Sequence, residues 1–367
     1  MVKKPKLNRL RRAKQIVPEV LDPRSKPAEP PSLEDVPKIT NETIAEHREQ
    51  VLKGARKFIY PLAHSKRTII IVTVSVIITA IIGLLAYCSL GLYRYYQYNT
   101  FIYRVTQVVP FPIAKAGKQY VSYENYLFEL RHYVHYYQSQ QEQNFSGTGR
   151  QQLIQFRKQA LDNVINQAYI KKLASKQHVS VSGKEVDMRL AEVRAQNRLG
   201  GNDKVFEDVL RSYWGWSIND FKRSLAQQIL TEKVAAALDT AAQQKAASVV
   251  QQAKSGADFT ALAKQYSDDP TAKDNGGDYG FAIAKTNPNV PPEVVNVLFS
   301  LKTGQVSDEI LASPVLASQG ASLQIVKLTA ISGNTVTAQH IVINLKDISS
   351  AVKALEKQQP PHPYVHL

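Results

Sequence analysis

The residues best suited to metal chemistry are an acid and two histidines at a regular spacing. Glu129, His132 and His135 are three residues apart, and on a helix this spacing places neighbours on one face. A metal site among helices also needs ligands from other helices, and the sequence has no second Glu-x-x-His pair. We therefore expect a solvated or tyrosine-packed helix face here and no metal site.

The chain has a single cysteine, Cys88, among 367 residues. One cysteine excludes an internal disulfide and a multi-cysteine zinc site, so the fold must be stabilised by packing alone. With 44% apolar residues, a chain of this length can fill the cores of about two domains. We find no nucleotide-binding loop and no hydrolase constellation, and we expect no small-molecule cofactor.

A second group of candidate residues lies between Asp258 and Leu328. Gly256 is suited to end one helix and Asp258 to cap the next, whose apolar residues recur at helical spacing. The segment Asn275–Asp278 contains two glycines that permit a tight reversal. Tyr279–Ile283 then alternates like a strand, so the sequence predicts a short helix, a turn and a strand.

Three motifs in this stretch resemble those of parvulin-type prolyl isomerases, which are small α+β domains that act on X-Pro bonds. Tyr266–Asp269 reads YSDD, Gly276–Gly280 reads GGDYG where the family has GGDLG, and Phe299–Ser307 reads FSLKTGQVS where the family has FxLKxGxVS. Together the three motifs make a specific resemblance.

The resemblance implies which residues form the site. It places Asp269 at the family's Asp or Cys position and Gln324 where the family has its second histidine. The family's pocket Met and Phe fall on Val290 and Val294, and Phe299 lies beside them. A glutamine can donate and accept hydrogen bonds, but it cannot change charge near neutral pH as histidine can.

The family's opening strand, which contains His-Ile-Leu, has no counterpart in Leu230–Ala257. A matching segment, Val336–Ile343, lies after the other motifs and carries His340 at the first histidine. Ser332–Asn334 can form a turn that folds this segment back, antiparallel, onto Leu323–Leu328. We predict a permuted module whose first strand comes from its C-terminal side. The alternative is a second, truncated repeat.

Isomerisation of an X-Pro bond needs no covalent step. The partial double bond must twist over a barrier of about 20 kcal/mol, and a catalyst lowers this barrier by holding the proline ring in an apolar pocket and stabilising the twisted amide. In the implied site, Asp269 and His340 would polarise the amide and Gln324 would support them. The apolar side chains of Val290, Val294 and Phe299 would shape the pocket.

Residues 100–240 are expected to form a helical domain. Ser122 can cap one helix, apolar residues recur close to every 3.6 positions from Leu153 to Leu173, and Ser182–Glu185 forms a capping box. Val105–Val121 is strand-like, with two prolines. A last helix is expected to start at Ser217 and to run toward Lys254.

The order of these helices ahead of a parvulin-like stretch is similar to that of the N-terminal domain of SurA-type periplasmic chaperones. The resemblance implies an apolar surface that holds unfolded protein segments. Trp214 and Trp216 are candidates to line such a surface, although we favour core packing for both of them.

The segment Thr68–Tyr93 has no charged residue or histidine, and it exceeds the roughly 20 residues that a spanning helix needs. Residues 1–67 hold 16 Lys and Arg against 8 Asp and Glu. The excess of cations predicts a single span with the N-terminus in the cytoplasm and the domains outside. The alternative is a cleaved signal peptide with an unusually long charged region.

The sequence thus predicts an α+β protein with six segments. These are a disordered basic tail at 1–38, an amphipathic juxtamembrane helix at 39–66, a transmembrane helix at 67–93, a SurA-like helical domain at 100–240, a parvulin-like domain at 241–345 and a C-terminal helix and tail at 346–367. We attribute the net charge of +15 to topology and contact with anionic lipid, and not to nucleic acid binding.

The predicted function is that of a membrane-anchored, extracytoplasmic foldase. It would isomerise X-Pro bonds and hold unfolded or newly exported proteins, and its other partner would be membrane lipid. The alternative is a chaperone or envelope scaffold whose isomerase domain is degenerate and inactive.

Overall fold

The structure is a computed structural model, and it describes residues 40–59, 65–196, 202–315 and 319–367. The chain divides into two compact units, residues 1–81 and 82–367, which we describe separately. The predicted basic tail at 1–38 lies outside the described residues.

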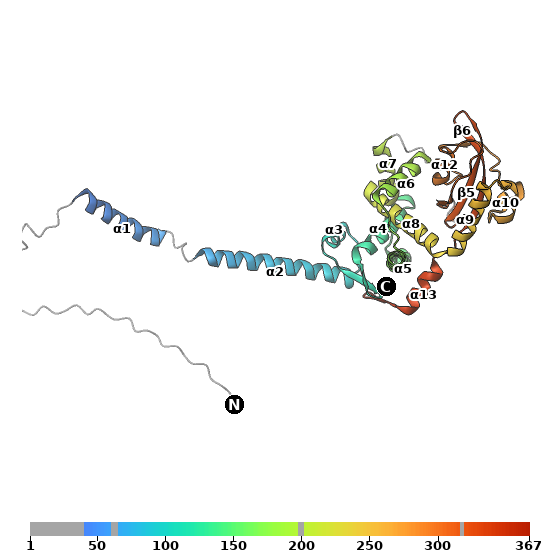
Figure 1. The fold of residues 1–367 in the computed structure, drawn as a ribbon. Coiled ribbons are helices and arrows are strands. Elements are labelled where there is room, and N and C mark those ends of the chain that lie inside the picture. The colour runs from blue at the N-terminus through green and yellow to red at the C-terminus, as the bar shows by residue number, and fades with distance from the viewer. Residues whose placement is uncertain (1–39, 60–64, 197–201, 316–318) are drawn as a thin grey trace, which may run out of the picture. The chain divides into compact units, whose positions relative to one another are not determined.

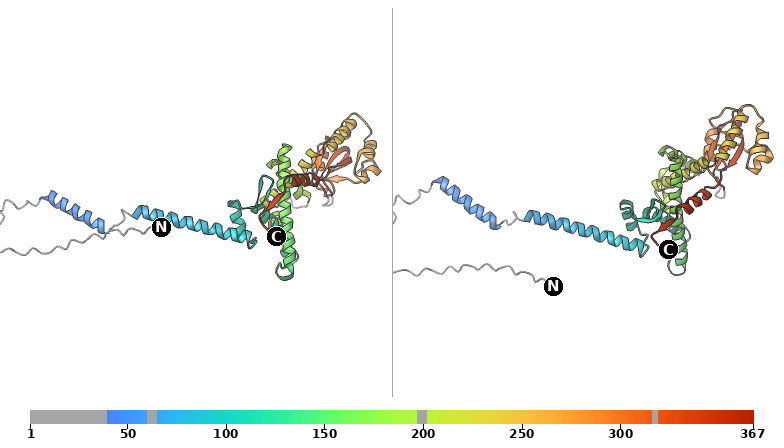
Figure 2. Two further views of the ribbon diagram at one scale, coloured as in Figure 1. Left: turned by 90° about the horizontal axis from the view of Figure 1, so that it is seen from below. Right: turned by 60° about the horizontal axis from the view of Figure 1, so that its bottom comes forward.

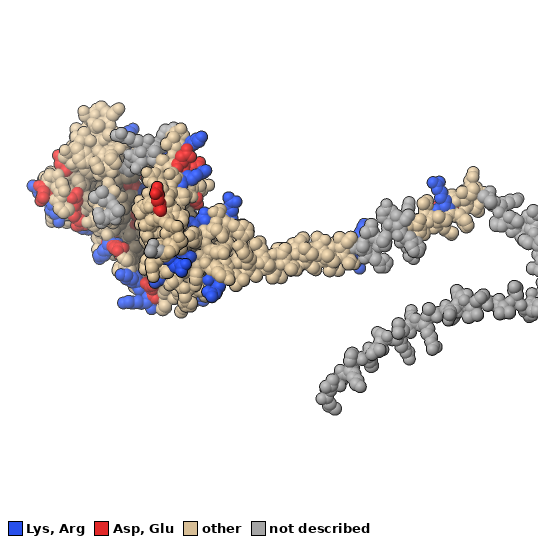
Figure 3. Space-filling model, turned by 180° about the vertical axis from the view of Figure 1, so that it is seen from behind, with Lys and Arg blue, Asp and Glu red and all other residues tan. Residues whose placement is uncertain are grey.

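The described part of the first unit is helical. The predicted juxtamembrane helix is present as α1 (Asn41–Ile59), which starts two residues later than expected. Helix α2 (Ser65–Tyr93) begins in this unit and continues into the next. From Lys66 to Tyr93 it is long and apolar enough to cross a membrane, and Figure 3 shows it as a surface free of charged side chains between its ends.

The second unit opens with the last turns of α2 and a largely helical region. Its elements up to residue 238 are α3 (Thr100–Val108), β1 (Pro112–Ala116), β2 (Gln119–Ser122), α4 (Tyr123–Gln140), the 3₁₀ turn η2 (Gly147–Gly149), α5 (Arg150–Lys176), α6 (Gly183–Gln196), α7 (Asp203–Trp214) and α8 (Ile218–Leu238). Helix α5 packs against α4 and α8, and its predicted apolar face is buried.

The expected strand from Val105 to Val121 is wrong in its first part, which belongs to helix α3. The side-chain oxygen of Asn99 accepts a hydrogen bond from Ile102 N at 2.9 Å and so caps the helix. Ile102 and Thr106, one turn apart, are buried. The β-branched residues of this segment therefore follow a helical period, and the strand begins only at Pro112.

The expected single helix from Ser217 to Lys254 is broken at Asp239. The break separates α8 from α9 (Thr240–Lys254), and the Asp239 carboxylate accepts a hydrogen bond from Ala242 N at 3.1 Å. Beyond the break, α9 packs on strands β5 and β6. The Asp239 side chain binds a backbone N–H group and thereby ends one helix and starts the next. The two helices then pack in different cores.

The remaining elements form the parvulin-like region and the C-terminus. They are α10 (Phe259–Tyr266), α11 (Pro270–Asn275), β3 (Ile283–Ala284), α12 (Pro292–Leu298), β4 (Ile310–Ala312), β5 (Ser322–Ser332), β6 (Thr335–Asn344), α13 (Ser349–Gln358) and β7 (Pro361–Pro363). Figure 1 shows α9 and α10 on one side of the sheet that contains β5 and β6, with α12 on the other.

The permuted arrangement is confirmed by the sheet order, β3-β6-β5-β4. Strand β6 folds back from the turn at Gly333 and pairs antiparallel with β5 from Ser332↔Thr335 to Ser322↔Asn344. Its other edge pairs with β3. The C-terminal strand is therefore a central strand of this sheet and does not start a separate repeat.

The expected strand Tyr279–Ile283 is much shorter in the structure, where β3 covers only Ile283–Ala284. Gly280 has a positive φ of 75°, and its N–H donates to the Asp278 carboxylate at 2.9 Å. This local turn bends the chain away from the sheet, since a residue with positive φ interrupts extended backbone.

The C-terminal segment is an integral part of the helical region. Helix α13 packs on α5, and β7 pairs antiparallel with β1 through Ala116↔Pro361 and Ala114↔Pro363. Figure 2 shows this red segment lying beside the elements that follow α2. The predicted C-terminal tail is therefore part of a three-stranded sheet, β2-β1-β7.

A cluster of charges joins the helical region to the parvulin-like region. The guanidinium of Arg189 on α6 lies with its Nη2 3.2 Å from Glu232 Oε2 on α8 and also contacts Glu293 on α12. Its Nε is 3.7 Å from Glu192 Oε2. The Ser313 hydroxyl donates to Glu293 Oε1 at 2.6 Å. Three carboxylates thus share one guanidinium at this contact.

This cluster predicts that stability depends on pH through Glu192. Burial and the nearby Glu293 carboxylate raise the pKa of Glu192 from 4.5 to about 7, against the opposing effects of Arg189 and of a hydrogen bond from the Asn296 amide. The folded chain then binds more protons than the unfolded chain between these values. The stability that protonated Glu192 contributes is fully present below pH 4.5. This stability is lost as the pH rises through 7.

Replacement of Glu192 by Gln should therefore remove this pH dependence. We expect E192Q to increase the free energy of unfolding at pH 8 by about 1–2 kcal/mol and to have little effect at pH 5, as measured by urea titration of the full chain in detergent. The exposed Glu309→Gln is the matched control. Equal pH profiles for E192Q and the parent chain would contradict the prediction.

Candidate active site

His340 lies in the middle of β6, and both nitrogens of its ring face acceptors. The ring is 6% exposed. Its Nδ1 is 2.9 Å from the carbonyl oxygen of Gly277 and its Nε2 is 3.1 Å from Asp269 Oδ2. Because a carbonyl oxygen can only accept, Nδ1 carries a proton. The second nitrogen, Nε2, faces the half-buried carboxylate of Asp269, so the two contacts together fix the orientation of the ring.

The backbone of Gly277 lies close against β6, and this contact fixes the position of the Gly277 carbonyl. Its φ is 88°, and a Cβ built there would lie 2.7 Å from the His340 carbonyl oxygen and 3.0 Å from the Ala263 Cβ. Its carbonyl also accepts a hydrogen bond from His340 N at 2.7 Å. Only glycine fits this position, which explains why the second glycine of the GGDYG motif is needed for the orientation of the histidine.

Asp269 is positioned at the start of α11. Its Oδ1 accepts a hydrogen bond from Thr271 N at 2.9 Å, while Oδ2 faces the imidazole of His340. The preceding Ser267 hydroxyl accepts hydrogen bonds from Asp269 N at 3.3 Å and from Val342 N at 3.1 Å. The YSDD motif is thereby attached to β6, which explains how residues 71 positions apart in the chain come together.

Tyr279 was not among the predicted site residues, yet its ring stacks on the imidazole of His340. The two ring centroids are 4.0 Å apart, with an angle of 21° between the planes. Burial raises the pKa of the Tyr279 hydroxyl far above its usual range. The sequence feature that could have indicated this role is the tyrosine of GGDYG, which stands where the family has leucine. Two aromatic rings stacked in this way make a favourable contact.

Gln324 lies on β5 and lines the same cleft as His340. Its side-chain amide donates to the Ser322 hydroxyl at 3.3 Å, whereas its Oε1 is buried with no hydrogen-bond partner among the described residues. A buried carbonyl oxygen without a partner is costly. This oxygen is available to a ligand.

The three predicted pocket residues do not line this cleft. Val290 and Val294 are fully buried in the core on one side of the sheet. Phe299 is half-buried against the same core, with the Lys285 ammonium 5.3 Å from its ring centroid. Their apolar side chains support the sheet, because two valines that match a Met and a Phe in sequence are too short to reach beyond the core.

The cleft itself has a volume of about 660 Å³. The polar groups that line it include those of Asp269, Gln324 and His340. The sequence predicts that Val290 and Val294 supply the apolar surface of the site. In the structure this surface comes from other residues, namely Tyr279, Phe281, Pro291, Val315 and Leu345. Among these, Phe281 is 41% exposed. The lining of the cleft thus combines apolar side chains with polar and charged ones, so it offers contacts of both kinds to a ligand.

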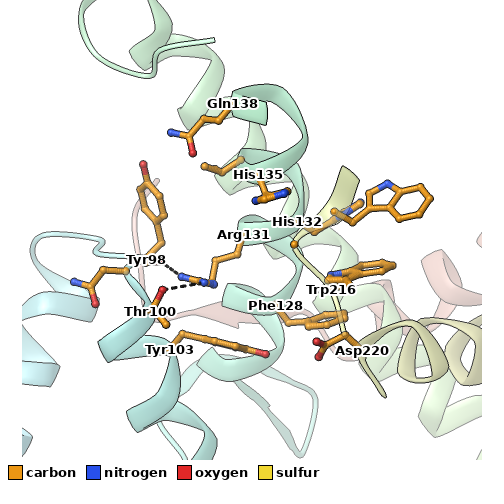
Figure 4. Close-up of a pocket in the computed structure, with 14 residues that line it drawn as sticks. Tyr98, Thr100, Tyr103, Phe128, Arg131, His132, His135, Gln138, Trp216 and Asp220 are labelled. Carbon is orange, nitrogen blue, oxygen red and sulfur yellow. Dashed lines mark hydrogen bonds between the residues drawn. The ribbon is translucent and has the colours of Figure 1, made fainter. Parts of the chain in front are cut away.

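A second pocket of about 340 Å³ lies in the helical region. Figure 4 shows Phe128, Trp216 and His132 stacked along its wall. The Phe128 and Trp216 centroids are 5.4 Å apart at 5°, and those of Trp216 and His132 are 4.5 Å apart at 26°. Trp214 lines the same pocket. Both tryptophans are partly buried, so they line a cavity as well as pack against the core.

The polar residues around this pocket do not converge on one point. Glu129 accepts a hydrogen bond from the Gln167 amide at 3.0 Å, while His135 Nε2 is 3.0 Å from the Ser212 carbonyl oxygen. Burial and the neighbouring His135 lower the pKa of His132 to about 4. The His132 ring is therefore neutral at pH 7 and contributes an aromatic surface.

Two family models match the chain, one on each region. A SurA-like N-terminal domain matches residues 63–235, and a PPIC-type PPIASE domain matches residues 219–315. Over residues 63–315 the chain therefore resembles a SurA-like N-terminal domain followed by a parvulin-type isomerase domain. The second match ends before β5 and β6, so the strands that carry Gln324 and His340 lie outside it.

Curated relatives resemble parts of this chain. Foldase protein PrsA of Caldanaerobacter subterraneus subsp. tengcongensis is 27% identical over 169 residues, which cover 41% of this chain and 51% of the relative. Chaperone SurA of Burkholderia orbicola is 46% identical over 74 residues, 20% of this chain and 16% of the relative. The chain thus spans about half of the first relative's length and about a sixth of the second's.

Among solved structures, foldase protein PrsA from Streptococcus pneumoniae has 22% sequence identity to this chain. The comparison covers 55% of this chain and 77% of the other, with a TM-score of 0.18.

Proposed function

We propose that the protein is a membrane-anchored, extracytoplasmic foldase that isomerises X-Pro bonds and holds unfolded, newly exported proteins. The observation that best supports the proposal is the Asp269–His340 pair in a cleft that apolar side chains also line. This arrangement combines the two requirements of the reaction, a surface for the proline ring and polar groups for the twisting amide.

In the proposed mechanism, the proline ring lies against the apolar wall of the cleft near Phe281 and Pro291. This contact removes water from the amide and restrains the ring while the bond twists. The Gln324 side chain can rotate to present its amide to the substrate carbonyl. Asp269 and His340 set the charge around the amide nitrogen, whose lone pair becomes localised as conjugation is lost.

The holding activity is assigned to the pocket of the helical domain. Its stacked Phe128, Trp216 and neutral His132 offer a flat aromatic surface, and aromatic side chains contribute much of the energy at protein interfaces. Arg131 stands beside this surface with its Nη1 donating to the Tyr98 carbonyl oxygen at 2.8 Å. We propose that apolar side chains of unfolded clients occupy this pocket.

Anchoring is assigned to α2, with the cytoplasmic side at its N-terminal end. Support comes from the length and apolar composition of the helix and from the excess of Lys and Arg that precedes it.

The alternative is a holding chaperone or envelope scaffold without isomerase activity. Two observations favour it, namely the glutamine at the second histidine position and the location of Val290 and Val294 in the core. Both reduce the likeness of the cleft to the family's site.

A refolding experiment separates the two functions. We expect the full chain in detergent to accelerate the proline-limited refolding of a test protein, and to suppress aggregation of an unfolded client. Trp216→Ala should weaken only the second effect, with Tyr213→Ala as the matched exposed control. Suppressed aggregation alongside an unchanged refolding rate would support the chaperone alternative and contradict the isomerase.

A further inference from the structure

The last turns of α2 are built into the core of the second unit. Cys88 and Leu92 are fully buried, while their neighbours Tyr87 and Leu90 are 53% and 58% exposed. The Leu92 carbonyl oxygen accepts a hydrogen bond from the Tyr123 hydroxyl at 2.6 Å. The helix therefore enters the domain with one face covered by protein and the other uncovered, and no linker separates the two.

The uncovered face lies at the depth where a bilayer would end. Counting from Thr68, the first residue after the charged start of the apolar run, a hydrocarbon layer of about 30 Å takes about 20 residues at 1.5 Å each. The layer then ends near Tyr87. Any part of the domain that packs beside Tyr87 lies at the membrane interface.

Helix α3 packs at this depth. A Cβ at Gly91 would lie 2.8 Å from Ile102 Cδ1, so glycine allows α3 to approach α2 closely. On the neighbouring turn, the rings of Tyr87 and Phe101 are 6.4 Å apart. Figures 1 and 2 both show α3 beside the end of α2.

One face of α3 is apolar and exposed. Phe101 is 53% exposed and Val108, seven residues later on the same face, is 83% exposed. Exposed Arg104 lies between them, and Ile102 and Thr106 on the other side are buried. Such an amphipathic helix, with a cation that can extend to the headgroups, is suited to lie in the plane of a membrane surface.

We propose that α3 docks on the outer leaflet of the bilayer through Phe101 and Val108, so that the domain is fixed on the membrane surface and not merely tethered to it. The proposal rests on the anchoring role assigned to α2 above. Continuity with the apolar face of α2 favours lipid as the occupant over a second copy of the chain, and Arg94 and Arg104 favour anionic headgroups.

Depth-dependent quenching tests the proposal in the full chain. In a Cys88→Ala background, single cysteines replace Val76 in α2, Phe101 or Val108 in α3, and Ser300 in the parvulin-type domain. Each carries an environment-sensitive fluorophore in vesicles of phosphatidylcholine and phosphatidylglycerol with brominated acyl chains. We expect strong quenching at positions 76, 101 and 108, and none at 300.

The outcomes distinguish the two levels of the proposal. Quenching at 76 without quenching at 101 and 108 would leave α2 as an anchor and overturn the docking of α3. Absence of quenching at 76 would contradict the anchoring itself. If the unlabelled Phe101→Cys chain forms a disulfide between two copies, and the labelled chain shows no quenching at 101, then a second copy covers this face and the proposal is also overturned.

Discussion

A chain that ends at Gly333 is expected to lose the fold of its parvulin-type sheet. The truncation removes β6, which pairs along its length with β5 and at one end with β3. It also removes Val336, Ile341 and Ile343, each at most 1% exposed. Burial of one such side chain contributes roughly 1.5–3 kcal/mol, so the three together rival the roughly 5–15 kcal/mol that stabilise a typical domain.

The measurement is the hydrogen exchange of backbone amides in β5 and α9, two elements that contact β6 in the parent chain. The matched control is a chain that ends at Asp347, which lacks α13 and β7 but keeps β6. We expect exchange protection of β5 to disappear in the shorter chain and to persist in the control. Equal protection in both chains would mean that the sheet does not depend on its C-terminal strand.

The second large effect is expected from the Asp269–His340 pair. Asp269→Asn keeps an N-cap residue at the start of α11 but removes the charge that faces the imidazole. His340→Ala removes the imidazole itself. We expect each variant to lower the catalysed rate of proline-limited refolding roughly 100- to 1,000-fold, the size of effect seen when one stabilising group is removed from an active site.

The exposed Asp274→Ala on the same short helix is the control for surface charge on α11, and thermal unfolding reports whether the fold is retained. Gln324→His tests the other polar position, where a second histidine is expected to raise the rate. If Asp269→Asn and His340→Ala both fold and both catalyse as well as the parent chain, the cleft is not the active site.

Several parts of the fold could be predicted because they depend on local interactions. Ser122 caps α4 and Ser217 caps α8 through hydrogen bonds to backbone N–H groups three residues ahead, and such contacts are present in the sequence itself. The apolar period of α5 specified its buried face in the same way. The permuted strand was also predictable, because its His-Ile motif and the turn at Gly333 are short-range signals.

The errors have a common physical cause. Val105–Val108 reads as a strand by residue type, but the cap at Asn99 and the burial of Ile102 and Thr106 on one side make it a helix. Tertiary packing overrides such propensities, which are worth less than about 1 kcal/mol per residue. The match to the family's motif likewise predicts that Val290 and Val294 line a pocket, whereas in the structure Val294 on α12 and Val290 just before it are buried in the core.

The sequence by itself predicted the apolar helix, the helical domain, the permuted sheet and the pairing of Asp269 with His340. The tertiary structure alone decided which side chains form the walls of that site, since Tyr279 meets His340 only after the loop crosses β6 at Gly277. It also decided that β7 joins β1 and that α3 lies beside the end of α2. Local periodicity specifies elements, whereas contacts between residues distant in the chain depend on how those elements pack.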